Sequence, residues 1–82
     1  MVREALESAR NFIQLERDTL EQLAPVGASY HAEAITDILV GLNNRRLVVV
    51  SVLLAAEREA NEHERQEIQA AMVMVNSPGR AF

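Results

Sequence analysis

One strong turn signal divides the chain into two arms of unequal length. Pro25 and Gly27 lie close together, and Pro25 disfavours helical backbone at the residue before it. On one side, residues 2–24 contain no Gly or Pro and are rich in good helix formers. On the other side, residues 30–75 contain no Pro. The sequence therefore predicts an all-α antiparallel helical hairpin, with helix 2–24, a turn at 25–29 and a long second helix over 30–75.

The first arm carries an apolar stripe with one polar interruption. Its members follow one another at spacings of four and three residues, as on one face of a packed helix. Glu16 occupies the one slot of this stripe that is not apolar. The apolar members are Val2, Leu6, Ala9, Ile13, Leu20 and Leu23, with Ala5 and Phe12 widening the stripe on one side.

The second arm has a polar interruption of its own at residues 43–46. Asn43, Arg45 and Arg46 are predicted to form a polar layer within a continuous helix. The alternative is a break near Asn43 and Asn44, and the absence of Pro favours continuity. The run 47–54 is rich in β-branched residues, but the chain offers no second strand for it to pair with, so it too is expected to be helical.

The unequal arms point to self-association. A hairpin that pivots at Gly27 brings Val2 opposite about Val52, which leaves residues 54–75 uncovered unless the chain folds back near Asn61. We expect two hairpins to form a dimeric helical bundle, with 47–54 at its centre and 68–75 as a docking surface. The predicted interface residues are Leu42, Val49, Val52, Leu53, Ala56, Ile68, Ala71, Met72 and Val75.

Composition narrows the classes of protein that need consideration. Eighty-two residues suit one domain, expected over 1–76 with a flexible tail at 77–82. The chain has no Cys, which excludes disulfides and thiolate metal sites. A net charge of −4 argues against nucleic acid and anionic membrane surfaces as partners. The longest apolar run, 47–56, is about half as long as a membrane-spanning helix, so a cytoplasmic protein is expected. No cofactor is expected either.

One weak metal site can be drawn on the acidic stretch after residue 56. Glu59, His63 and Glu67 are spaced four residues apart and share a face if the helix is continuous. One imidazole and two carboxylates suit Zn²⁺ or a similar ion. A solvated helix face is the plainer interpretation and the one we adopt.

These features favour a non-enzymatic helical interaction module that self-associates and binds a protein partner. Small adaptors, assembly or secretion-type chaperones and anti-activators that bury an apolar helix of a partner have this character. Two alternatives are a nucleic-acid-associated regulator that uses Arg45 and Arg46, and a structural assembly subunit of a phage or bacterium. No nucleophile, zincin or phosphate-loop motif points to an enzyme.

Overall fold

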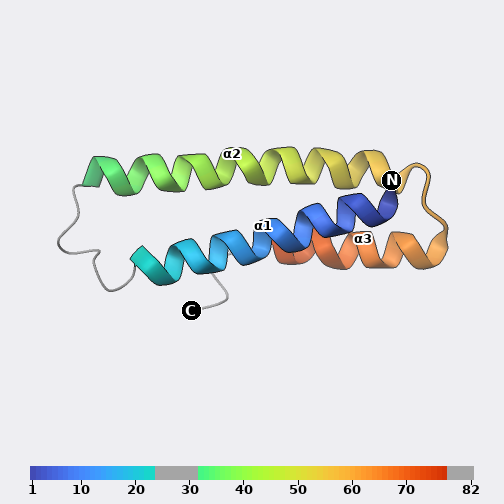
Figure 1. The fold of residues 1–82 in the computed structure, drawn as a ribbon. Coiled ribbons are helices and arrows are strands. Elements are labelled where there is room, and N and C mark those ends of the chain that lie inside the picture. Colours follow the sequence, from blue (N-terminus) through green and yellow to red (C-terminus); the bar gives the residue numbers. More distant parts are fainter. Residues whose placement is uncertain (24–31, 78–82) are drawn as a thin grey trace.

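The computed structural model describes residues 1–23 and 32–77, and the described part contains three α-helices and no β-strand. The helices are α1 (Val2–Leu23), α2 (Ala32–Glu57) and α3 (Glu62–Val75). Figure 1 shows α1 and α3 running in the same direction and α2 running opposite to both. The predicted all-α class is therefore confirmed. The expected turn at 25–29 and all but the first residue of the tail at 77–82 lie outside the described residues.

The second helix is continuous through its polar interruption. Gly41, Asn43 and Asn44 all lie inside α2, so the predicted continuity holds and the alternative break does not occur. Gly and Asn are weak helix formers that each cost about 1 kcal/mol or less, and neither removes a backbone donor as Pro does.

The second helix is not continuous to Val75, and this part of the prediction is wrong. α2 ends at Glu57, and α3 begins at Glu62 after a short turn. Asn61 caps α3: its side chain accepts a hydrogen bond from the Glu64 N–H at 2.8 Å, and the Asn61 N–H donates to Glu64 Oε1 at 2.9 Å. This capping box satisfies backbone donors that a continuous helix would have paired internally.

Because α3 turns back, a single chain covers most of the apolar surface that was expected to need a second subunit. Ile68 and Val75, which lie on the expected overhang, are fully buried, as is Leu53 of α2. The expectation of a long uncovered second arm is therefore also wrong, since the chain takes the alternative of folding back near Asn61. The buried core consists of Ala5, Ala9, Phe12, Leu42, Val49, Leu53, Ala56, Ala60, Ile68 and Val75.

The first helix packs against both other helices, and its buried side is turned slightly from the expected stripe. Ala5, Ala9 and Phe12 are the buried apolar residues of α1, and Val2, Leu6 and Ile13 are partly buried against the core. The rotation follows from having two neighbours, because α1 contacts both α2 and α3. Glu16, the polar member of the stripe, is buried as well.

Candidate functional site: a buried arginine cluster and an exposed apolar stripe

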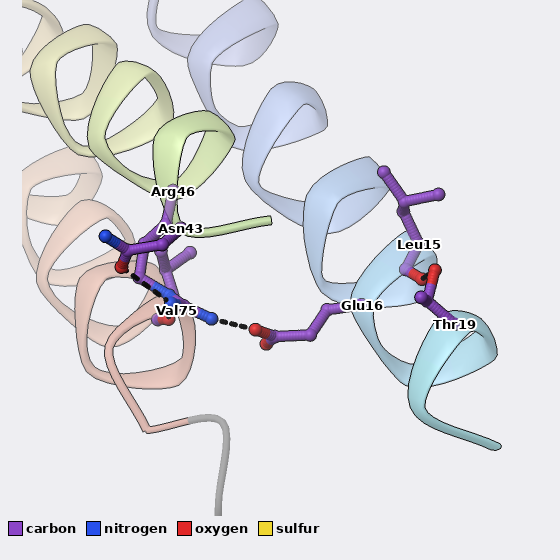
Figure 2. A network of polar contacts seen from close by, with 6 residues as sticks. All are labelled: Leu15, Glu16, Thr19, Asn43, Arg46 and Val75. Atoms are coloured by element: carbon purple, nitrogen blue, oxygen red, sulfur yellow. Dashed lines mark hydrogen bonds and ion pairs between the residues drawn. The ribbon is translucent and has the colours of Figure 1, made fainter. Parts of the chain in front are cut away.

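Arg46 ties the three helices together from the middle of α2. Its guanidinium forms an ion pair with Glu16 of α1, its Nε donates to the Val75 carbonyl at the end of α3 at 2.9 Å, and its Nη1 donates to Asn43 Oδ1 at 3.2 Å (Figure 2). The guanidinium carbon also lies 5.3 Å from the centroid of the Phe12 ring, a cation–π distance. We call Arg46, Glu16 and Asn43 the arginine cluster.

The arginine cluster joins charges and a carbonyl from all three helices. The Arg46 and Glu16 side chains are only 15% and 9% exposed, so each charge needs the other as a partner. A last-turn carbonyl of a helix has no partner within its own helix, and Arg46 supplies one to Val75. Among the described residues, no buried side-chain nitrogen or oxygen lacks a hydrogen-bond partner. The buried polar atoms of the cluster are therefore satisfied within the chain.

The predicted polar layer is present in part. Arg46 and Asn43 belong to it, whereas Arg45 is exposed and makes none of its contacts. Sequence reasoning did not pair Arg46 with Glu16, although the signal was visible. Each of these charged residues interrupts an apolar stripe on its own helix, and two such interruptions pair when the helices pack.

The weak metal site at Glu59, His63 and Glu67 is not formed. His63 Nε2 lies 3.0 Å from Glu67 Oε1 on α3, but Glu59 lies in the turn before that helix and off its face. Within the part of the chain that the structure describes, no group of three His, Cys, Asp or Glu side chains could hold a metal ion. The helix break at 58–61 is the physical reason that this weak candidate does not assemble.

Most of the predicted interface residues are core residues of one chain. Ala71 and Met72 are half-buried against the core, and Val52 is 39% exposed. For the others, burial is already complete without a second copy, because α3 and α1 cover them. These buried residues are Leu42, Val49, Leu53, Ala56, Ile68 and Val75.

A second row of apolar residues runs along the outer side of α2. Val40, Leu47 and Leu54 are 52%, 59% and 50% exposed. They are spaced seven residues apart, which places them on one side of the helix, two turns from one to the next. We call these three residues the apolar stripe. The predicted interface set did not include it, although the heptad spacing of these large apolar residues can be read from the sequence.

Further large apolar side chains lie beside the apolar stripe. Leu39 and Val48 are 45% and 63% exposed on the two flanks of α2, and Val52, nearer its packed side, is 39% exposed. Contiguous exposed apolar surface of this kind marks binding sites on soluble proteins and lipid-facing surfaces on membrane proteins. By length and composition alone, the stretch Glu33–Glu57 is also able to span a membrane, a weak indication that core helices share.

A groove between α1 and α3 lies on another side of the molecule. It encloses about 460 Å³ and is lined mainly by Leu6, Ile13, Ala71 and Met74. Its lining is mostly apolar, with Arg10 and Glu67 as its charged members, and Glu67 is also the partner of His63. This groove contains part of the segment 68–75 that the sequence singled out for docking.

No protein-family model, curated protein or solved structure matches this chain. Function is therefore inferred from the geometry of the arginine cluster and of the apolar stripe.

Proposed function

We propose that this chain is a non-enzymatic helical interaction module that associates with itself through the apolar stripe. The observation that carries the proposal is the half-exposed row of Val40, Leu47 and Leu54 on a helix whose other side is already packed. Side chains of this size lose favourable burial energy when left in water, at about 25 cal/mol per Å². A second helix laid along the stripe would recover that energy.

The ionisable groups of the described residues support an interaction role over catalysis. The buried pair, Arg46 and Glu16, is occupied in holding the helices together. The pair of His63 and Glu67 lies at the open surface, with the His63 side chain 82% exposed.

In this proposal the self-associated form acts as a small adaptor, assembly factor or chaperone for a protein partner. The apolar groove between α1 and α3, with the adaptable side chain of Met74 in its lining, is the second surface available for such a partner. The alternative role in binding nucleic acid is weakened, because one of the two Arg residues assigned to it, Arg46, is held by Glu16 and Val75. The other, Arg45, is exposed.

A charge placed in the apolar stripe tests the proposal. Leu47→Glu should leave the helical circular dichroism spectrum unchanged, because Leu47 is 59% exposed in the single chain. Burying an unpaired carboxylate at an interface costs about 2–3 kcal/mol or more, so the dissociation constant should rise about a hundredfold. Sedimentation velocity at a series of micromolar concentrations measures this change.

The matched control adds the same charge elsewhere. Gln69 is exposed on α3 and outside the core, so Gln69→Glu should associate as the unaltered chain does. If the unaltered chain sediments as a monomer throughout the series, the proposal is wrong. It is also wrong if Leu47→Glu and Gln69→Glu associate equally well.

A further inference from the structure

We infer that the apolar stripe pairs with the same stripe of a second copy in antiparallel orientation, about a two-fold axis at Leu47. This inference rests on the proposed function and deepens it, because it names the occupant of the stripe and its direction. A two-fold interface brings the same patch of both copies together, so a suitable patch must be complementary to itself.

The outer side of α2 has this self-complementary pattern. Counted from Leu47, the apolar residues Val40 and Leu54 lie seven positions away in either direction. The polar residues Asn43 and Ser51 lie four positions away in either direction. In an antiparallel pair centred on Leu47, apolar residues therefore lie level with apolar residues of the second copy, and the polar residues Asn43 and Ser51 lie level with each other along its edges. All of these side chains are exposed in the single chain.

Charge at the two ends of α2 selects the antiparallel direction. Asp37 lies within α2, ten residues or about 15 Å before Leu47, and Arg58 is the first residue of the turn that follows the end of α2 at Glu57. Both side chains are exposed, and among the described residues neither forms an ion pair. Antiparallel pairing places Asp37 of each copy near Arg58 of the other copy, which gives two such contacts in the dimer. Parallel pairing in register would place Asp37 near Asp37 and Arg58 near Arg58.

The middle of α2 favours a protein occupant over a lipid one. Asn43, Asn44 and Arg45 are exposed halfway along the stretch Glu33–Glu57 that could span a membrane. A bilayer would bury them at its centre, where an Arg alone costs about 2.5–3.5 kcal/mol or more. At the edge of a helix pair, the same side chains remain in water or bond across the interface.

Charge reversal tests the pairing of Asp37 with Arg58. Asp37→Arg and Arg58→Asp each replace two attractive contacts by two repulsive ones, so each variant alone should dimerise about 10- to 30-fold more weakly at low salt. An equimolar mixture of the two variants restores both contacts, and it should form a heterodimer about as tight as the unaltered dimer. The double variant Asp37→Arg/Arg58→Asp should likewise recover self-association.

Disulfide trapping tests the direction, and the chain helps because it contains no Cys. Chains carrying Val40→Cys mixed with chains carrying Leu54→Cys should form a mixed disulfide under mild oxidation, because antiparallel pairing brings residue 40 to residue 54 of the second copy. Either variant alone should remain uncrosslinked. Parallel pairing gives the opposite pattern, with crosslinks within each variant and none between them.

The outcomes separate this inference from the proposal beneath it. The inference is wrong if the dimer depends on Leu47 but its dissociation constant does not change on charge reversal. It is also wrong if residue 40 crosslinks to residue 40. In both cases self-association through the stripe remains. A monomeric chain overturns both. Leu47-dependent flotation of a monomeric chain with phosphatidylcholine vesicles would also overturn both and assign the stripe to lipid.

Discussion

At the scale of single residues, the ion pair between Arg46 and Glu16 has the largest consequences. Burial removes both charges from water, so the pair adds little net stability but makes each partner indispensable to the other. Arg46 also donates hydrogen bonds to Asn43 and to the last carbonyl of α3. The pair therefore sets how the three helices align lengthwise, a role that apolar contacts alone specify poorly.

Glu16→Gln should lower the free energy of unfolding by about 3 kcal/mol, because it leaves the Arg46 charge buried without a counter-charge. Urea denaturation measures the loss. Glu7→Gln, an exposed substitution of the same type on the same helix, should change stability by no more than about 0.5 kcal/mol. Equal effects of the two variants would contradict the burial of the ion pair. Glu16→Leu/Arg46→Met should restore stability to near that of the unaltered chain.

At the scale of elements, the short turn at 58–61 decides the architecture. It converts one long predicted helix into α2 and α3, and the capping box of Asn61 and Glu64 holds the start of α3. The sequence Asn-Glu-His-Glu contains the signature of such a box, a capping residue followed three positions later by Glu. Because the residues on both sides of this signature are good helix formers, the sequence predicted one continuous helix here.

Asn61→Ala separates the two architectures by the sign of its effect. If Asn61 caps α3, the substitution should destabilise the chain by about 1 kcal/mol. In a continuous helix, the same substitution would stabilise it, because Ala is the best helix former. Chemical denaturation gives the sign, and Gln66→Ala, at an exposed position inside α3, supplies the pure propensity effect for comparison. A gain in stability with Asn61→Ala would contradict the turn.

At the scale of the whole molecule, α2 has two apolar sides, one buried in the core and one exposed. One side, which includes Leu53, packs against α1 and α3, and the other carries the apolar stripe. The described molecule is elongated, with principal extents of 48 × 20 × 15 Å, so α2 presents its outer side along the length of the molecule. The same helix thus supplies both the core of one chain and the surface proposed to join two.

Two identical substitutions, six residues apart on α2, should tell these sides apart. Leu53→Ala removes a fully buried side chain and should cost about 3 kcal/mol at every protein concentration. Leu47→Ala should cost no more than about 0.5 kcal/mol in dilute solution. At high concentration it should also reduce the rise in melting temperature that self-association produces. Equal losses in dilute solution would show that Leu47 is covered within the single chain.

Local physical chemistry was sufficient to predict α1 and the helical state of α2. Helix-forming residues without Gly or Pro account for α1, and the absence of Pro accounts for the passage of α2 through Gly41 and Asn43. These properties depend on neighbours within a few residues along the chain, and they are legible without a structure.

The turn at Asn61 and the partner of Arg46 depended on residues distant in sequence. A capping box is worth about 1 kcal/mol and cannot by itself break a helix-compatible segment. Burial of Ile68 and Val75 against α1 and α2 supplies the larger energy. Glu16 and Arg46 were each conspicuous on their own helix, but their pairing needed the third helix to exclude water around them. Long-range burial, which no local pattern encodes, selected one arrangement among several that the helices allowed.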